Sequence, residues 1–226
     1  MINQYSRTEL LIGSDGLEKL KNSRVAVFGV GGVGGFTVEA LARSGVGTID
    51  IIDNDTVSLT NINRQIIATH STVGKLKVDV MEERIKNINK ECNVIKYDLF
   101  FDSNTKDEIL NNKIDFIVDS CDSVNSKKLI IEEALKRKID FISSMGTANK
   151  LDPTKLEITD IRKTVNDPLA RIMRKFVKDS KIKDKVVVLS STELPKKNGT
   201  VLGSVSFVPS SAGLLITSYI INKIIK

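Results

Sequence analysis

A glycine pattern directly after a short apolar run constrains this chain more than any other feature. Residues 25–28 are typical of a buried strand, glycines in the spacing G-x-G-x-x-G follow, and residues 37–42 are typical of a helix. In a strand–turn–helix of this kind, glycines let the backbone turn tightly and approach a phosphate, and the helix N-terminus offers free N–H donors. The pattern predicts a nucleotide-binding loop, with a plain glycine-rich turn as the alternative. The glycines expected in this loop are Gly29, Gly31, Gly32 and Gly34.

An acidic residue ends the next apolar run. Residues 48–52 are strand-like, and Asp53 follows them, 19 residues after Gly34. This separation is close to the ~20 residues at which dinucleotide-binding folds place a carboxylate for the ribose hydroxyls. An NAD enzyme would next need a substrate site built for hydride transfer, and no such group of residues follows. The sequence therefore predicts that Asp53 binds the ribose of a nucleotide other than NAD.

Further polar motifs follow in a fixed order. They are the D-x-D of residues 53–55, the N-x-x-R-Q of residues 61–65, Lys77 and Asp122. With the glycine loop, this series resembles the ubiquitin-activating-enzyme-like adenylyltransferases, which include the activators of the molybdopterin and thiamine sulfur-carrier proteins. The resemblance implies a Rossmann-like α/β fold, the use of ATP and an acyl-adenylate intermediate.

The side chains in these motifs suit an attack on the α-phosphate of ATP, which spreads negative charge over phosphate oxygens. Arg64 offers a planar fork of donors, and Lys77 offers a movable point charge. Asn61 and Gln65 form hydrogen bonds without adding charge. Lys75 is an alternative to Lys77, and the spacing in the family favours Lys77.

Asp122 follows an expected strand that ends at Asp119, so it lies at the carboxyl end of the sheet, where ligands bind in such folds. A lone carboxylate suits Mg²⁺, which takes one or two protein carboxylates together with phosphates. We therefore expect ATP and Mg²⁺ as cofactors, with Asp122 on the metal. By resemblance, Arg7 reaches into the ATP site of a partner subunit, which implies a homodimer; a solvated charge is the alternative.

The fold class expected is α/β, with a largely parallel Rossmann-like sheet flanked by helices and additional strands in the C-terminal half. One adenylation domain spans residues 1–226. Residues 1–23 form a helical arm, 24–150 the nucleotide-binding core, and 151–226 the substrate side. The apolar face expected for the arm consists of Leu10, Leu11, Leu17 and Leu20. The strands expected after the first half are residues 155–161, 185–190 and 205–209, and the final helix covers 212–225.

One segment, residues 162–185, carries nine Lys or Arg against three Asp. Its excess of +6 equals the formal net charge of the whole chain. Clustered cations attract a polyanion chiefly through counterion release, so this segment is a candidate tRNA contact. A solvated helix face is the alternative.

The chain has two cysteines, Cys92 and Cys121, and no C-x-x-C. The zinc site of the sulfur-carrier activators is therefore absent from the sequence, and residues 122–226 offer no cysteine for a thioester. Cys121 is interpreted as a small buried residue, and His70, the one histidine, as a capping or surface residue rather than a general base. This composition favours an enzyme that makes an adenylate and holds no thioester.

Residues 4–13, 164–170 and 191–193 resemble the branch of the family that dehydrates threonylcarbamoyladenosine in tRNA. There, ATP activates a carboxylate of the modified adenosine, a nearby nitrogen or oxygen of the same modification closes a ring, and AMP leaves. An intramolecular nucleophile needs no enzyme cysteine. The resemblance implies a tRNA substrate. The alternative is activation of the C-terminus of a sulfur-carrier or ubiquitin-like protein, and a sulfur-relay partner is left open.

The C-terminal apolar run is too short for a membrane span and contains Asn222 and Lys223. We expect it to pack on the sheet or across a dimer interface rather than to enter a membrane. No basic-then-apolar signal segment opens the chain, so a cytoplasmic location is expected.

Overall fold

The computed structural model describes residues 2–196, 199 and 201–226. These residues form a seven-stranded sheet in the order β3-β2-β1-β4-β5-β7-β6, in which every neighbouring pair is parallel except β6 and β7. The strands are β1 (Arg24–Phe28), β2 (Thr48–Ile52), β3 (Asn93–Tyr97), β4 (Phe116–Asp119), β5 (Asp140–Ser144), β6 (Leu156–Asp160) and β7 (Val187–Ser191). The predicted α/β class with extra strands in the C-terminal half is confirmed.

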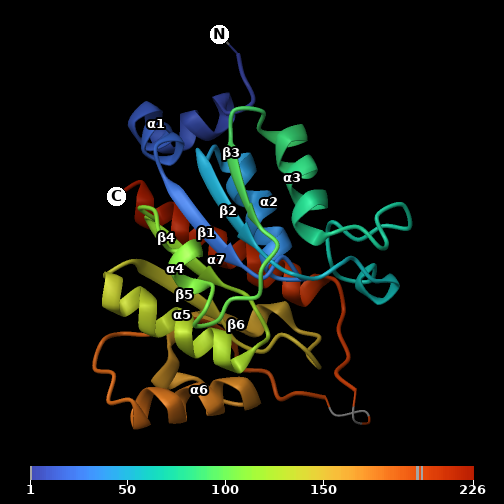
Figure 1. Ribbon diagram of the computed structural model, residues 1–226, viewed down its shortest axis with the longest axis vertical. Helices are drawn as coiled ribbons and strands as arrows, with labels where there is room; N and C mark the ends of the chain where they lie inside the picture. Colours follow the sequence, from blue (N-terminus) through green and yellow to red (C-terminus); the bar gives the residue numbers. More distant parts are fainter. Residues whose placement is uncertain (1, 197–198, 200) are drawn as a thin grey trace.

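Helices cover both faces of the sheet (Figure 1). They are α1 (Ser6–Lys21), α2 (Gly34–Ser44), α3 (Lys77–Ile88), α4 (Lys106–Ile109), α5 (Val124–Arg137), α6 (Pro168–Asp179) and α7 (Phe207–Ile224). Short 3-10 turns lie at Leu59–Asn61, Pro153–Lys155 and Ile161–Lys163. Two apolar cores follow from this layering. One joins the sheet to α2, α3 and α7, and the other joins it to α4, α5 and α6.

The strand order places the point of reversal between β1 and β4. From β1 the chain adds β2 and β3 on one side, and then returns to add β4 on the other side of β1. In an open parallel sheet, ligands bind at the carboxyl ends of the two strands that flank such a reversal. The loops that begin at Gly29 and Ser120 leave these two strand ends.

Two expectations about local structure are wrong. Residues 205–209 are not a strand, because α7 already begins at Phe207; Pro209 lies in its first turn, where a proline is tolerated. In α1, Leu17 and Leu20 are buried, but Leu10 and Leu11 are 88% and 86% exposed. The helix kinks at Gly13, which has φ +75°, so its first half does not continue the buried face of its second half.

The C-terminal helix α7 packs on α2 rather than standing free. A Cβ added at Gly213 would lie 2.4 Å from the carbonyl oxygen of Val33, so the close approach of the two helices depends on this glycine. Thr217 Oγ1 accordingly reaches the carbonyl oxygen of Thr37 at 3.3 Å. Among the described residues, no helix is long and apolar enough to cross a membrane.

Candidate active site

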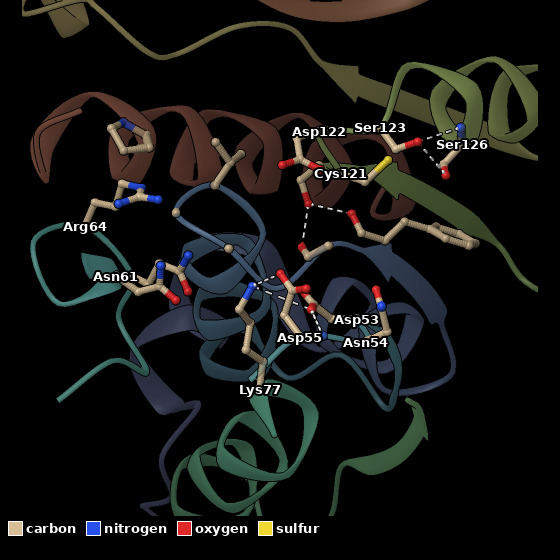
Figure 2. A pocket seen from close by; sticks show the side chains of 18 of the residues that line it. Asp53, Asn54, Asp55, Asn61, Arg64, Lys77, Cys121, Asp122, Ser123 and Ser126 are labelled. Atoms are coloured by element: carbon tan, nitrogen blue, oxygen red, sulfur yellow. Dashed lines mark hydrogen bonds and ion pairs between the residues drawn. The ribbon is translucent and has the colours of Figure 1, made fainter. Parts of the chain in front are cut away.

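A cleft of about 710 Å³ opens at the carboxyl ends of β1, β2 and β4. Figure 2 shows how side chains from the loops after these strands point into it. The cleft brings together most of the residues predicted from the sequence, which are Gly29, Gly31, Gly32, Asp53, Asn61, Arg64, Gln65, Lys77 and Asp122. Gly34 and Arg7 do not line it.

The glycine loop is fixed against the loop after β4. Gly29 has φ +86°, and a Cβ there would lie 2.8 Å from the carbonyl oxygen of Ser120. A Cβ at Gly34 would lie 1.8 Å from the carbonyl oxygen of Gly29, so Gly34 acts by letting α2 begin directly behind the loop. Ser120 Oγ donates to the carbonyl oxygens of Phe28 and Gly29 at 2.9 and 2.8 Å. The loop therefore leaves no room for side chains at these two glycines.

Asp53 is held at the inner end of the cleft by backbone donors. Its carboxylate accepts from the N–H of Val30 at 2.7 Å and from the N–H of Asp55 at 2.9 Å. Burial raises the pKa of Asp53, although the nearby Lys77 ammonium and these two donors oppose the rise. The bond to Val30 ties the end of β2 to the glycine loop, so the ribose-binding candidate and the phosphate-binding candidate have a fixed relative position.

Lys77 begins α3, and an acidic pair holds its side chain. Its Nζ lies 2.6 Å from Asp55 Oδ2 and 3.6 Å from Asp53 Oδ1. Lys77 is 7% exposed at the side chain, whereas Asp55 is 64% exposed. Sequence reasoning quoted Asp55 within the D-x-D motif but omitted it from the site. Lys75, the alternative cation, is exposed and lies outside the cleft lining.

The N-x-x-R-Q run supplies the cleft with guanidinium donors from Arg64 and a side-chain amide oxygen from Gln65. Arg64 Nη1 donates to the carbonyl oxygen of Thr60 and to Asn63 Oδ1, both at 2.9 Å, and the other guanidinium donors remain for a ligand. Asn61 is buried and its Oδ1 accepts from the N–H of Ser58 at 3.1 Å. Gln65 Oε1 is buried and has no hydrogen-bond partner in the described part of the chain. A buried polar atom of this kind is rare in folded proteins, and here it borders the cleft.

Asp122 lies three residues beyond β4, which ends at Asp119, and its side chain is exposed to the cleft. Across the residues the structure describes, no three His, Cys, Asp or Glu side chains are grouped as metal ligands. The exposed Asp122 carboxylate in the cleft fits a metal that takes one protein carboxylate and gains its other ligands from phosphates and water, as Mg²⁺ does.

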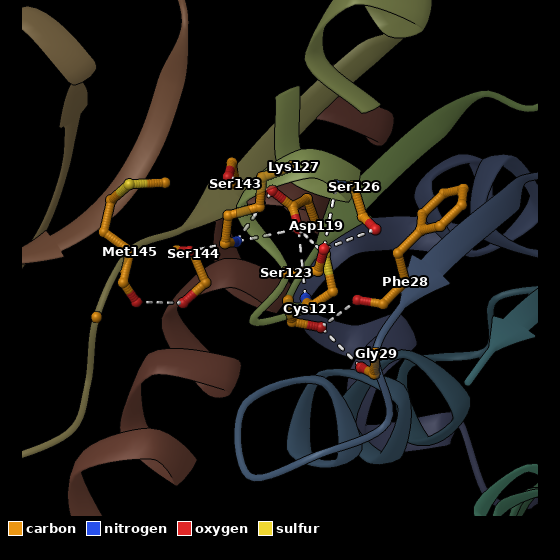
Figure 3. A network of polar contacts seen from close by, with 12 residues as sticks. Phe28, Gly29, Asp119, Cys121, Ser123, Ser126, Lys127, Ser143, Ser144 and Met145 are labelled. Carbon is orange, nitrogen blue, oxygen red and sulfur yellow. Dashed lines mark hydrogen bonds and ion pairs between the residues drawn. The ribbon is translucent and has the colours of Figure 1, made fainter. Parts of the chain in front are cut away.

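A buried network of polar contacts lies at the end of β4, next to Cys121 in the loop that carries Asp122 (Figure 3). Asp119 is fully buried and accepts from Lys127 Nζ at 3.0 Å and from Ser143 Oγ at 2.5 Å. Lys127, which is 1% exposed, also donates to the carbonyl oxygen of Ser144 at 2.7 Å. Lys127 thus joins the ends of β4 and β5. Sequence reasoning missed this network, because Asp119 was interpreted only as a strand end.

The structure corrects the expectation for Cys121, which is partly exposed and lines the cleft, whereas Cys92 is buried. Burial raises the pKa of Cys92 to about 11. Burial and the Asp119 carboxylate raise the pKa of Cys121 well above its usual value, and the Cys121 thiol donates to Asp119 at 3.0 Å. His70 is exposed and lies outside the cleft lining. Neither thiol has the lowered pKa of a nucleophile.

An apolar wall of the cleft was not predicted. Leu99, Phe100 and Phe101 follow β3 and line one side, and the Phe101 ring packs edge-on against Phe28 at 4.7 Å between centroids. Ser126 Oγ fixes this segment by donating to the carbonyl oxygen of Phe101 at 2.8 Å. A short loop sequence after an edge strand gives no pattern from which such a wall can be recognised.

Arg7 and the basic segment lie apart from the cleft lining. Arg7 is exposed in the first turn of α1. In the basic segment, residues 162–185, most cations are exposed, but Arg174 is half-buried and donates to the carbonyl oxygen of Thr164 at 2.7 Å. Arg162 is paired with Asp160 at 3.0 Å. These two arginines are therefore occupied within the protein, and the free cations are found mainly along the outer side of α6 and after it.

Comparison with known proteins relates this arrangement to a family. The ThiF family model matches residues 5–225. A tRNA threonylcarbamoyladenosine dehydratase of Bacillus subtilis (strain 168) is 44% identical over 244 aligned positions, which cover 100% of this chain and 96% of the relative.

Two solved structures of E. coli tRNA N6-threonylcarbamoyladenosine dehydratase have the same fold. Each superposes with a TM-score of 0.92 and covers 98% of this chain and 93% of its own. One is a complex with ATP, 34% identical in sequence, and the other is a complex with AMP, 33% identical. The similarity thus extends over both halves of the sheet.

Proposed function

Because the chain belongs to the ThiF family, we propose that it is an ATP-dependent dehydratase of threonylcarbamoyladenosine in tRNA. It adenylates the carboxylate of the modified adenosine and promotes cyclisation with release of AMP. The main support is the relative of that name that is 44% identical along the full chain. The cleft gives independent support, since it gathers cations, a ribose-side carboxylate and an unpaired buried amide oxygen at the strand reversal.

The reaction has two displacements. A carboxylate oxygen of the substrate attacks the α-phosphorus of ATP, and pyrophosphate leaves. An atom of the ureido group then attacks the acyl carbon, and AMP leaves with the electron pair of the broken C–O bond. Charge develops on phosphate oxygens in the first step, and the second step needs no enzyme nucleophile, which agrees with the raised pKa of both thiols.

The residues of the cleft divide this work between them. Asp53 accepts from the ribose hydroxyls, and Gln65 Oε1, for which the described residues offer no donor, gains one from the nucleotide. Arg64 and Lys77 bind phosphate oxygens. Lys77 must exchange Asp55 for phosphate, and this exchange has a low cost because Asp55 is 64% exposed and regains water.

Asp122 is the residue that would hold Mg²⁺. The metal, when bound, supplies positive charge that neutralises phosphate oxygens. Asp122 is suited to this role because it is exposed to the cleft, while Asp119 and Lys127 below it fix the loop that carries it.

We also propose a homodimer in the cytoplasm. Arg7 completes the ATP site of the neighbouring subunit, since it does not line the cleft of its own chain. The exposed Leu10 and Leu11 on the same arm give an apolar surface that a second copy would cover. Mixing Arg7→Ala with Asp122→Ala protein should restore activity in hybrid dimers, and no recovery despite proven exchange of subunits would contradict the proposal.

The exposed cations of the basic segment contact the tRNA backbone in this proposal. Arg171, Lys175 and Lys178 lie on exposed positions of α6, and Lys181 and Lys183 follow it. Phosphate contacts of this kind position a nucleic acid without reading its sequence.

The test is mass spectrometry of tRNA nucleosides, with AMP release measured in parallel. Incubation of the protein with ATP, Mg²⁺ and tRNA that carries threonylcarbamoyladenosine should lower the mass of that nucleoside by one water and release AMP. Arg64→Ala should reduce the rate roughly 100- to 1,000-fold, as expected for the loss of a donor to the transition state. An unchanged nucleoside, with AMP formed only on a sulfur-carrier or ubiquitin-like protein tail, would establish the alternative function.

A further inference from the structure

A second cavity, of about 370 Å³, adjoins the nucleotide cleft. The two share the loop after β4, Ser120 to Asp122, and they also share Thr147, Ala148 and Leu202. The carboxylate of Asp122 therefore stands at their border. A group in the second cavity has direct access to the place where the α-phosphate lies in the proposed function, and the volume falls within the range of small-molecule sites.

Most of the wall of the second cavity is apolar, with Met145, Leu169 and Pro195 among its residues. Among the residues that the structure describes, its ionisable lining beyond the shared loop is one ion pair, Lys150 and Asp167, whose side chains are 1% and 0% exposed. Burial of a charged pair is costly unless its hydrogen bonds are complete. The state of these hydrogen bonds therefore indicates whether the pair serves packing alone.

Two backbone donors hold Asp167 in place. It accepts from the N–H of Ala170 at 3.0 Å, which caps α6, and from the N–H of Gly146 at 2.9 Å. Lys150 is not fully used. Its Nζ donates to the carbonyl oxygen of Gly146 at 2.8 Å and approaches Asp167 Oδ2 only at 3.5 Å. An ammonium has three donors, so within the described residues one donor of Lys150 has no acceptor.

The chemistry of the substrate matches this remaining donor. The side arm of threonylcarbamoyladenosine carries a methyl group, a hydroxyl, a carboxylate and a ureido oxygen. When the carboxylate is at the border near Asp122, the rest of the arm extends away from the nucleotide. Apolar walls suit the methyl group, and a buried ammonium suits the ureido oxygen, because hydrogen bonds from charged donors are the strong ones.

We infer that the second cavity holds the threonylcarbamoyl side arm of the substrate, and that Lys150 donates a hydrogen bond to its ureido oxygen. The inference rests on the proposed function. It gives Asp167 a positioning role, since Asp167 holds Lys150 and also begins α6, whose exposed cations continue outward from the cavity. The tRNA backbone is thereby contacted by α6, and the side arm by Lys150, which Asp167 holds at the start of α6.

Two hydrogen bonds fix the segment that carries Leu202 beside the cavity. Asn149 Oδ1 accepts from the N–H of Gly203 at 2.7 Å, and its own N–H donates to the carbonyl oxygen of Gly203 at 2.8 Å. These two bonds hold Leu202 over both the cleft and the cavity. The arm is then enclosed between this segment and α6.

The test compares Lys150→Met with Lys90→Met, a change at an exposed lysine that lines neither hollow. Lys150→Met should lower kcat/KM for modified tRNA roughly 10- to 150-fold, the value of one hydrogen bond to a charged donor, with unchanged ATP affinity. Lys90→Met should match wild type. Leu169→Trp, which reduces the cavity and leaves both residues of the ion pair in the sequence, should lower kcat/KM for the tRNA in the same way.

The outcomes separate this inference from the proposed function. Wild-type protein that dehydrates modified tRNA, together with normal kcat/KM in both cavity variants, overturns the inference and leaves the function standing. If Lys150→Met does not fold, Leu169→Trp decides alone: normal turnover overturns the inference, and a selective loss with intact ATP affinity supports it. Wild-type protein that releases no AMP with modified tRNA overturns the function itself.

Discussion

Two strand ends of the same sheet carry an aspartate–lysine pair, and the pairs differ in completeness. After β4, Asp119 and Lys127 are 0% and 1% exposed, and both have several protein partners. After β2, Lys77 bonds at 2.6 Å to Asp55, which is 64% exposed, and lies 3.6 Å from Asp53. The first pair is closed to solvent and ligand, whereas the second faces the cleft and can exchange a partner.

The difference shows how one residue combination serves two purposes. A saturated buried pair fixes the backbone around it, because removal of either charge leaves the other unpaired in the interior. A pair with one hydrated member gives less stability, but its cation is available to an anion. The ends of β4 and β2 thus supply the support and the reactive charge, respectively, of the same cleft.

The largest effect on stability is expected when the closed pair, Asp119 and Lys127, is broken. Lys127→Met leaves the Asp119 carboxylate buried without a cation and should lower the free energy of unfolding by about 3–5 kcal/mol. Urea denaturation monitored by circular dichroism measures this loss. Lys136→Met, a change at a 72% exposed position of the same helix, is the control and should stay within about 0.5 kcal/mol of wild type.

Breaking the open pair, Lys77 and Asp55, should lower activity more than stability. Lys77→Met removes a charged donor to phosphate and should lower the rate of AMP formation roughly 10- to 150-fold. Its loss of unfolding free energy should be smaller than that of Lys127→Met, because Asp55 is largely hydrated. Lys75→Met should leave the rate unchanged. Equal destabilisation by Lys77→Met and Lys127→Met would remove the distinction between the two pairs.

A pH series sharpens the comparison at Asp53. Burial raises its pKa above the unfolded value of 3.8, so the folded protein holds this proton more tightly than the unfolded chain does. The associated stability is present below the unfolded pKa and is lost as pH rises through the folded pKa. Asp53→Asn should therefore match wild type in acid and become relatively more stable at neutral pH, without ATP, while it loses ATP affinity. A variant that becomes relatively less stable as pH rises would contradict this sign.

The smallest effect is expected at the thiol beside the closed pair. Cys121→Ser should keep normal turnover, because the raised pKa of Cys121 keeps the thiol protonated and the acceptor lies within the substrate. Cys92 should also resist a thiol reagent at pH 8 in the native protein and react after unfolding in urea, since it is buried and its pKa is raised to about 11. A thioester trapped on Cys121 would contradict the expectation that turnover needs no cysteine.

The sequence reveals the open pair and conceals the closed one for a physical reason. Asp53, Asp55 and Lys77 stand in local motifs whose spacing follows from a strand, a turn and a helix start. Asp119 ends β4 and Lys127 lies in α5, so only the fold brings them together. Nothing in the sequence distinguishes a buried lysine from an exposed one. Lys150 is hidden in the same way, since only the fold shows that it is enclosed.

The pattern of apolar residues also gives a wrong prediction where it does not show what an apolar face packs against. The pattern predicts one buried face for the leucines of the arm, but none of the described residues covers Leu10 and Leu11. Residues 205–209 are rich in strand-forming side chains, yet α7 begins within them because its apolar length packs on α2. Periodicity identifies an apolar face, and tertiary packing decides whether and where it is buried.

The bridge that Lys127 makes between the ends of β4 and β5 has a consequence for protein engineering. The loop after β4 borders the nucleotide, and the loop after β5 leads into the second cavity, so one ammonium sets the spacing of both. A graft that exchanges the second cavity with that of a relative must carry Asp119, Lys127 and the end of β5 as one cassette. Transplanting the loop alone would leave the new loop without the hydrogen bonds from Lys127 that set its position relative to β4.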